Sequence, residues 1–320
     1  MYPHIPEKIR HTFESSSHNH GIKYETTLLR GRKVVIYIAS PNPFDAQIYL
    51  NNMIAWLNFA SEIASPKCAQ TLHIYLLLTD AKKRLPEIDT EPIDQIHANT
   101  AFTTSCSSTN DIFVFRREEW FKVFIHETFH CLGLDFSSST DDDSNRRILS
   151  LFPKIDPTTD IRLYETFCEM WAEVFHLLFC LFTKSNGECL QFSEAKFHKA
   201  LHKEQVFSIG QSNKILRRAG HQYKDLFLSH PLDKSKKYKE NTPAFSYYVI
   251  KSLMLWNLDR FMKWCEPNGL QFNVSPNGIT GYCDLVEELA KHDRGYKRMV
   301  ERISNGKTTL RMTSIDTKWC

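Results

Sequence analysis

The chain has 320 residues, of which 42% are apolar and 12% aromatic, so it can bury a sizeable core and is globular rather than disordered. Lysine and arginine exceed aspartate and glutamate by 40 to 37, and this small excess does not indicate a nucleic-acid partner or an acidic membrane. The nine cysteines form no C-x-x-C pair and several lie in apolar helical runs, which favours reduced thiols in a cytosolic setting.

No targeting or membrane segment is predicted. The N-terminal residues have neither the basic region nor the apolar region of a secretory signal. The most apolar segment, 167–182, is interrupted by Glu169, Glu173 and His176, so it is too short and too charged to span a bilayer. We therefore expect a cytoplasmic protein without a membrane partner; its oligomeric state is left open.

The first half of the chain predicts a sheet with helices. Four segments carry the β-branched or apolar runs that are typical of strands: 32–39, 71–78, 99–103 and 111–115. A helix is expected over 45–65, because Asp45 is an N-cap residue and Pro66 follows the apolar pattern. Another helix begins at about Arg117 and ends at Gly133, where a C-cap glycine lets the chain turn.

The second half is predicted to be helical. Loop-like stretches at 137–145 and 156–160 separate the halves, so we expect an α+β fold with an N-terminal α/β lobe (1–150) and a helical C-terminal lobe (151–320). The polar start of the chain, including Ser15 to His20, predicts no element. The helical patterns of the second lobe cover 163–182, 193–206, 211–219, 244–265 and 284–303.

The helix that starts near Arg117 contains the pattern H-E-x-x-H, formed by His126, Glu127 and His130. Histidines at i and i+4 project from one helix face and can hold one Zn²⁺ ion, while the intervening glutamate can act on a water molecule. Phe121, Phe124, Ile125, Phe129 and Leu132 occupy the opposite side, so we expect the histidines to face away from the core. Two histidines are not sufficient, because a catalytic zinc takes three protein ligands.

The predicted helix 163–182 supplies candidates for the third ligand. Glu165, Glu169, Glu173 and His176 form one stripe on this otherwise apolar helix. Buried carboxylates are costly unless they are paired or bind a metal, so the stripe supports a metal site. We expect Glu169 to be the third ligand and Glu173 to accept a hydrogen bond from a ligand histidine.

This arrangement resembles the gluzincin metallopeptidases, in which H-E-x-x-H is followed by Glu-x-x-x-(Asp/Glu) on a second helix. The resemblance implies that the first glutamate completes the zinc site and that the acidic residue four positions later orients a histidine. Glu169 and Glu173 fit this spacing. Glu165 and Glu169 fit it equally well, so Glu165 remains an alternative third ligand.

A metzincin-type site, with Asp135 as third ligand after Gly133, is disfavoured by the spacing. In that pattern the ligand would fall at position 136, which is occupied by Phe136. We therefore regard Gly133 as a helix stop and assign no ligand role to Asp135.

Two further segments support a peptidase of the zincin type. Residues 99–102 are similar to the Asn-Ala-Phe edge strand that pairs with extended substrates in thermolysin-like enzymes. Residues 117–127 and 246–252 resemble predicted metallopeptidases of large DNA viruses of eukaryotes, a group without an established substrate. If the protein is viral, we expect it in the host cytoplasm or the virion.

The sequence thus predicts a two-lobed, zinc-dependent peptidase that acts on a peptide or protein substrate. Glu127 would be the general base, with His126, His130 and Glu169 holding Zn²⁺. Gluzincins usually add a residue that stabilises the oxyanion, and Tyr248 is our candidate, followed by Tyr247 and Tyr164. The alternative is a non-peptidase virion or host-interaction protein that retains the metal site.

Overall fold

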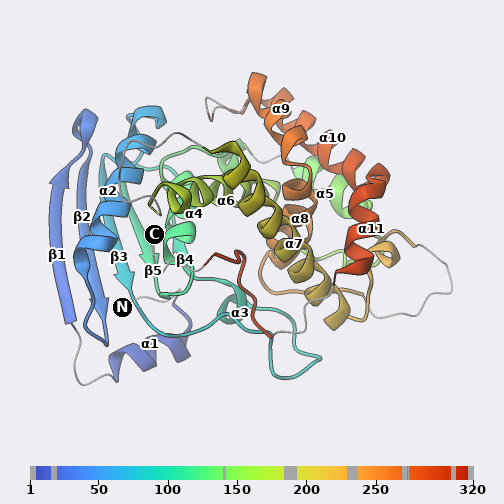
Figure 1. Cartoon of the computed structure of the whole chain (residues 1–320), viewed down its shortest axis with the longest axis horizontal. Coiled ribbons are helices and arrows are strands. Elements are labelled where there is room, and N and C mark those ends of the chain that lie inside the picture. Colours follow the sequence, from blue (N-terminus) through green and yellow to red (C-terminus); the bar gives the residue numbers. More distant parts are fainter. Residues whose placement is uncertain are drawn as a thin grey trace.

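A mixed five-stranded sheet forms the N-terminal half of the protein (Figure 1). The computed structural model describes residues 5–15, 20–139, 142–183, 193–228, 237–268, 272, 274–303 and 308–315. Its strands are β1 (His20–Thr27), β2 (Lys33–Ser40), β3 (Thr71–Leu77), β4 (Ala101–Thr103) and β5 (Thr109–Val114). They lie in the order β1-β2-β3-β5-β4, with β2, β3 and β5 parallel and the edge strands β1 and β4 antiparallel to their neighbours. The predicted α+β class is confirmed.

Helices cover the sheet and make up the second half. In the described part of the chain the α-helices are α1 (Glu7–Glu14), α2 (Ala46–Ile63), α3 (Gln95–Ala98), α4 (Trp120–Cys131), α5 (Asp142–Ser150), α6 (Leu163–Thr183), α7 (Glu194–Arg218), α8 (Lys251–Trp256), α9 (Leu258–Asn268), α10 (Pro276–His292) and α11 (Arg294–Arg302). Short turns of other helix types are η1 (Leu29–Gly31), η2 (Ser137–Ser139), η3 (Tyr223–Phe227) and the π-helical turn η4 (Phe245–Ile250). One cluster of buried apolar side chains extends from the sheet through α4 and α6 into α10.

The strands that the sequence predicted are present, and their side chains alternate. In β2, Val34, Ile36 and Ile38 are buried, whereas the residues between them are partly exposed. The same pattern in β3 shows that one sheet face packs on helices and the other is more open. β1 was not predicted, because this largely exposed edge strand has no continuous apolar run: Ile22 and Tyr24 alternate with charged residues.

Helix α4 carries the H-E-x-x-H pattern and is buried along its whole length. It ends in a Schellman turn: the N–H of Leu134 donates to the Phe129 carbonyl and the N–H of Gly133 to the His130 carbonyl. Gly133 has a φ of +65°, and a Cβ atom there would lie 2.9 Å from Cys68 Sγ. The predicted glycine stop is therefore confirmed, and it directs the following residues back toward His130.

The helical half differs from prediction in its interruptions. Two predicted helices join into the single helix α7, because Ile209, Gly210 and Gln211 are buried in the middle of a continuous helix. The predicted helix 244–265 is instead divided at Asn257, after the π-helical turn η4 and α8. The predicted loop 137–145 contains η2 and the start of α5.

The last described segment, residues 308–315, returns to the middle of the molecule beside α4 (Figure 1). Leu310 N donates to the Lys83 carbonyl and Leu85 N to the Thr308 carbonyl, at 3.0 Å each. The C-terminal segment therefore connects the helical half with the loop that precedes α3.

Three further observations concern the chain as a whole. Cys68 and Cys106 form a disulfide, so the prediction that all the thiols are reduced was wrong. The two cysteines lie 38 positions apart, in loops that sheet pairing brings together, and their spacing in the sequence did not reveal this pairing.

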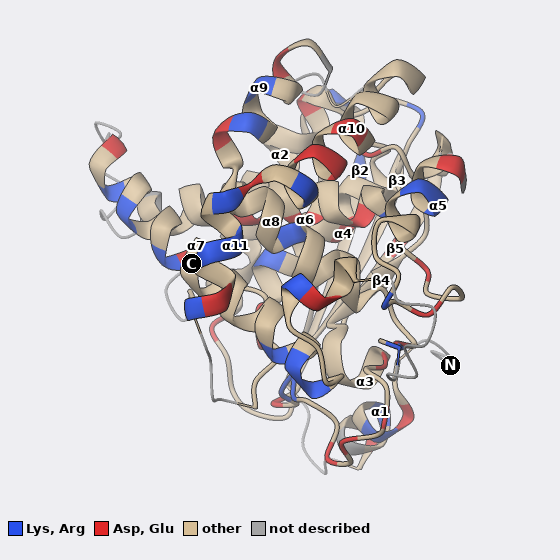
Figure 2. Ribbon diagram, turned by 90° about the vertical axis from the view of Figure 1, so that its right-hand side faces the viewer, with Lys and Arg blue, Asp and Glu red and all other residues tan. Residues whose placement is uncertain are grey.

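No helix within the described residues combines the length and apolar character needed to cross a membrane. Basic and acidic residues are interspersed along the helices visible in Figure 2, in line with the small net charge.

Candidate metal centre

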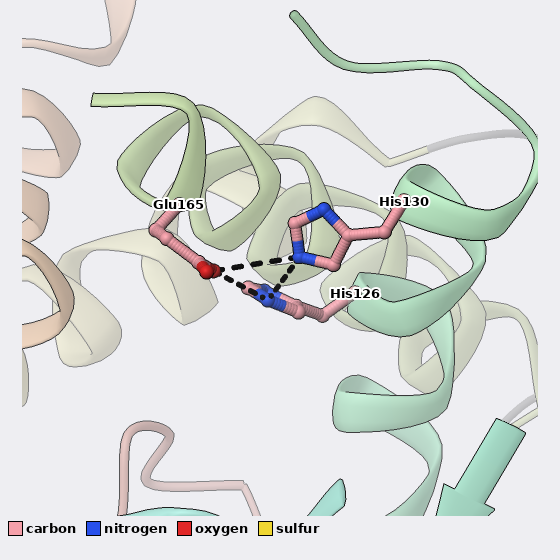
Figure 3. Close-up of side chains that lie close together, drawn as sticks. All are labelled: His126, His130 and Glu165. Atoms are coloured by element: carbon pink, nitrogen blue, oxygen red, sulfur yellow. Dashed lines mark hydrogen bonds and ion pairs between the residues drawn. The ribbon is translucent and has the colours of Figure 1, made fainter. Parts of the chain in front are cut away.

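Two helices bring three ligand atoms together. His126 and His130 project from α4, and Glu165 projects from the first turn of α6 (Figure 3). Glu165 Oε2 lies 3.1 Å from His126 Nε2 and 3.4 Å from His130 Nε2, and the two Nε2 atoms are 3.1 Å apart. All three side chains are nearly buried. The histidines point toward α6, and both also border a cleft.

The spacing of these atoms fits a tetrahedral zinc ion. Zinc bonds to nitrogen and oxygen are about 2.0–2.2 Å long, which places neighbouring ligand atoms roughly 3.3–3.6 Å apart. The three separations in the structure, 3.1, 3.1 and 3.4 Å, are within a few tenths of that range. Two histidines with one carboxylate also form a common donor set of catalytic zinc, which leaves a fourth position open.

Each ligand histidine has a carboxylate at its other ring nitrogen. His126 Nδ1 lies 2.9 Å from Glu169 Oε1, and His130 Nδ1 makes a short hydrogen bond with Asp135 Oδ2. Asp135 is held in turn by the Ser137 hydroxyl, at 2.8 Å. A hydrogen bond to a carboxylate at Nδ1 fixes the tautomer that leaves Nε2 free for a metal, as at His130; at His126 the nearby charge of Glu169 favours the same tautomer.

The third ligand residue on α6 therefore lies one helical turn earlier than predicted. Glu165, not Glu169, lies with the two Nε2 atoms, whereas Glu169 contacts the Nδ1 side of His126 and forms a buried ion pair with Lys122. Glu173 does not contact a ligand histidine; it accepts a hydrogen bond of 2.7 Å from Lys251. Carboxylates four residues apart share one helix face, and only the placement of α6 against α4 decides which of them reaches the histidines.

Asp135 has a role that neither metal pattern predicted. Its Oδ2 atom contacts Nδ1 of His130, so it lies on the side of the ring that faces away from the other ligand atoms. Cys168 Sγ lies 3.6 Å from the same oxygen. The Schellman turn at Gly133 folds the chain back and places the Asp135 carboxylate beside His130 Nδ1. This explains how a residue only five positions after His130 can orient the His130 ring.

Three buried lysines neutralise the carboxylates around the centre. Lys83, Lys122 and Lys251 are each at most 1% exposed. They pair with Glu119, Glu169 and Glu173, respectively. A buried charge without a partner is strongly destabilising, so these pairs must remain intact for the helices to pack. These lysines were not predicted to be buried, although Lys122 lies in a run of apolar residues.

The C-terminal segment supplies partners to the same charges. Met312 N and Thr313 N both donate to Glu119 Oε1 at 2.7 Å, and Lys251 donates to the Met312 carbonyl at 3.1 Å. The Met312 side chain borders a small cavity of about 30 Å³ beside His126, Glu127 and Glu169. This segment was not predicted to belong to the centre, because nothing in its sequence identifies its distant partners.

Glu127 lies at the edge of a cleft of about 340 Å³. The cleft is also bordered by the three ligand residues and by the edge strand β4. Burial raises the pKa of Glu127 above its ordinary value, although the positive charge of the two histidines opposes this. A carboxylate beside the ligand atoms and open to a cleft is placed to exchange protons with a molecule bound there.

The electrostatics of the centre favour a cation. Burial alone would lower the pKa of His126, but hydrogen bonds to Glu165 and Glu169 outweigh it and raise that pKa to about 9. Burial would raise the pKa of Glu165, yet the charge of His130 and the hydrogen bond from His126 lower it below its ordinary value. The surrounding carboxylates thus stabilise positive charge at the ligand atoms. Metal binding would release the protons that the two histidines hold.

Tyr248, the residue predicted to stabilise the oxyanion, does not border the cleft. The Tyr248 hydroxyl donates to the Leu310 carbonyl at 2.5 Å, and its side chain is 2% exposed, so it holds the C-terminal segment instead of facing the cleft. Its neighbour Tyr247 borders the cleft, with its ring 6.3 Å from that of His126. Tyr164 packs 5.9 Å from the His130 ring. Tyr247 and Tyr248 are successive residues of the helical turn η4, and successive side chains of a helix point in different directions, which separates the two tyrosines.

Comparisons with known proteins return no match for this chain, whether the chain is compared with protein families, with curated proteins or with solved structures. Its function must therefore be inferred from the geometry of the centre and the cleft.

Proposed function

We propose that this protein is a zinc-dependent peptidase of the gluzincin type. The observation that carries the proposal is the tetrahedral spacing of His126 Nε2, His130 Nε2 and Glu165 Oε2, with Glu127 beside them at the cleft. His126, His130 and Glu165 would hold the ion. When bound, Zn²⁺ lowers the pKa of a water molecule in its open position and polarises a carbonyl group.

The residues of the chain would divide the remaining work. Glu127 accepts a proton from the attacking water and donates it to the leaving amine. Glu169 and Asp135 keep the two histidines in the required tautomer and orientation. Tyr247 is the candidate to stabilise the oxyanion, because burial raises its pKa well above the ordinary value and its hydroxyl keeps a proton to donate.

A peptide is the substrate that the cleft favours. Strand β4 borders the cleft, and no described strand pairs with its outer edge. In an antiparallel edge strand, every second residue directs its N–H and C=O away from the sheet, where an extended peptide can bind them. This offers main-chain recognition beside Glu127 and the ligand atoms.

The first test is metal content followed by peptide cleavage. We expect the purified protein to contain about one zinc per chain and to cleave a mixed peptide library. The variant Glu127→Gln should retain the metal and lose at least about a hundredfold in kcat. Glu62→Gln, on the exposed side of α2, makes the same chemical change far from the cleft and should cleave normally.

Two results would redirect the proposal. Protein that cannot be loaded with zinc would refute the metal centre. Zinc binding at one equivalent, without cleavage of any library peptide, would favour a non-peptidase protein that retains the metal site.

A further inference from the structure

One arginine lies in the wall of the cleft. Arg162 directly precedes α6, and among the described residues that border the cleft it is the only lysine or arginine. Its side chain is 40% exposed, so a molecule bound in the cleft can reach it. Arg162 takes no part in the proton transfers proposed for Glu127, and an arginine does not act as a metal ligand. Its role in the cleft is therefore open to recognition of the substrate.

The guanidinium group of Arg162 is held on one edge only. Its Nε and Nη2 atoms pair with Asp160 Oδ2 at 2.6 and 2.5 Å, and its backbone N–H donates to Ser246 Oγ at 3.0 Å. The other edge, at Nη1, lies 4.0 Å from Glu165 Oε1, beyond hydrogen-bond distance. Burial raises the pKa of the neighbouring Tyr164 to about 12, and the Arg162 guanidinium opposes this rise. A guanidinium has more N–H donors than these neighbours take, so an oriented donor remains for a ligand.

The acidic residues of the cleft leave room for an anion beside Arg162. Asp160 forms an ion pair with Arg162 and is 59% exposed, so water screens its charge. Glu165 lies beside the two ligand histidines. Glu240 accepts a hydrogen bond of 2.6 Å from the Tyr238 hydroxyl, and burial raises the pKa of Glu240 to about 8, so it is largely protonated at neutral pH. Recognition at Arg162 would therefore depend on its directed N–H donors more than on net charge.

The position of Nη1 limits how far a bound group lies from the cleaved bond. The oxygens of one carboxylate are about 2.2 Å apart, so Nη1 lies within about 6 Å of Glu165 Oε2, the proposed ligand atom. An extended peptide advances about 3.5 Å per residue. A group bound at Nη1 would therefore belong to a residue one or two positions from the cleaved bond.

We propose that Arg162 binds a carboxylate group of the substrate, one or two residues from the cleaved bond. This inference rests on the proposed peptidase function and specifies its substrate class. Two sources carry this group: the free C-terminus of a peptide and the side chain of an aspartate or glutamate. Both offer the planar pair of oxygens that a guanidinium binds through charge-assisted hydrogen bonds.

Three sets of peptides test the proposal and separate the two sources. They share one alanine-rich sequence and end in a free carboxylate, in an amide, or in an amide with one Asp placed at each internal position in turn. Hydrogen bonds to charged groups change an equilibrium constant roughly tenfold to hundredfold, and the exposure of Arg162 favours the lower end. We expect kcat/KM for the free-acid peptide or for one Asp peptide to exceed that of the plain amide at least about tenfold.

Mass spectrometry of the products shows which bond is cleaved. A preference for the free acid would assign the site to the C-terminus of the substrate, and a preference for an Asp peptide would assign it to a side chain. Equal kcat/KM for all three sets would overturn the inference while the peptidase function stands.

Substitution of Arg162 tests whether this residue carries the preference. Arg162→Gln should reduce the preference to less than about threefold, and Arg162→Lys, which keeps the charge, should restore part of it. Arg147→Gln is the matched control: Arg147 is 43% exposed and pairs with Asp284 at 2.7 Å, but it lies on α5 and does not border the cleft. It should keep the wild-type preference.

Zinc content is measured for every variant, because Arg162 also neighbours Glu165, and preferences are compared between zinc-loaded proteins. If Arg162→Gln lowered kcat/KM equally for the anionic and amide peptides, Arg162 would not recognise a carboxylate, and the inference would be wrong.

A binding assay distinguishes failure of this inference from failure of the proposed function. Fluorescence anisotropy of the same peptides, labelled at the N-terminus, on full-length Glu127→Gln protein measures recognition without cleavage. If wild-type protein cleaves no peptide, but an anionic peptide binds about tenfold more tightly than the amide and added Arg162→Gln abolishes that difference, the carboxylate site is supported and catalysis is refuted. Equal affinity for the anionic and amide peptides would refute the carboxylate site, whether or not peptides are cleaved.

Discussion

Separate substitution of the two carboxylates of α6, Glu165 and Glu169, gives the sharpest test of the metal centre. Glu165 Oε2 approaches both Nε2 atoms, whereas Glu169 approaches only the Nδ1 side of His126. Glu165→Gln removes the negative charge of a direct ligand, and we expect the Kd for zinc to rise about a hundredfold or more, equivalent to at least ~2.7 kcal/mol. Glu169→Gln keeps an oxygen that can accept from Nδ1, so its loss should be about tenfold, the low end for residues that orient ligands.

The same two substitutions should affect the unfolding free energy in the opposite order, with the larger loss for Glu169→Gln. Lys122 is fully buried and its partner carboxylate is Glu169. Glu169→Gln leaves that charge uncompensated, and we expect the metal-free protein to lose about 3–5 kcal/mol of unfolding free energy. The cationic neighbours of Glu165 are His126 and His130, which can lose their protons when the carboxylate is removed, and Arg162, 4.0 Å away and 40% exposed, so Glu165→Gln should have a smaller effect.

The assay combines a chelator-competition titration of zinc with chemical unfolding of the metal-free protein. A double variant, Glu169→Gln with Lys122→Met, should recover most of the stability, because an apolar residue replaces the unpaired charge. It should not recover the zinc affinity of the wild type. If Glu169→Gln weakened zinc binding more than Glu165→Gln, the ligand assignment would be wrong.

Two further predictions concern the cleft and the C-terminal segment. Tyr247→Phe should lower kcat about a hundredfold with little change in unfolding free energy, because Tyr247 borders the cleft. Tyr248→Phe leaves the Leu310 carbonyl without this donor, so it should cost about 1–3 kcal/mol of stability and leave kcat nearly unchanged. The reverse pattern would refute the assignment of Tyr247, and not Tyr248, to the cleft. Burial raises the pKa of Glu204, which accepts from Ser314, to about 7, so its stabilising contribution is complete below pH ~4.5 and is lost as pH rises through about 7. Urea unfolding from pH 4.5 to 8 should show this loss, up to ~3 kcal/mol, and Glu204→Gln should remove it; an identical pH profile in the variant would contradict the assignment.

Several features of this protein follow from the sequence because they depend on neighbours within one or two turns. The i, i+4 spacing of His126 and His130 places both rings on one face wherever the helix packs. Gly133 ends α4 for a local reason, since its positive φ is unfavourable for a residue with a Cβ atom. The β-branched and apolar runs around Ile36 and Ile74 likewise predicted two strands of the sheet.

Tertiary structure decided what local spacing leaves degenerate. Glu165 and Glu169 lie one turn apart on the same face of α6, and only the packing of α6 on α4 decides which of them reaches both histidines. Tyr247 and Tyr248 are adjacent in sequence, and only the packing of η4 places one at the cleft and the other against Leu310. The buried lysines and the segment around Met312 could not be anticipated either. Their partners lie far away in sequence, and a charge becomes part of the centre only when the folded chain removes it from water.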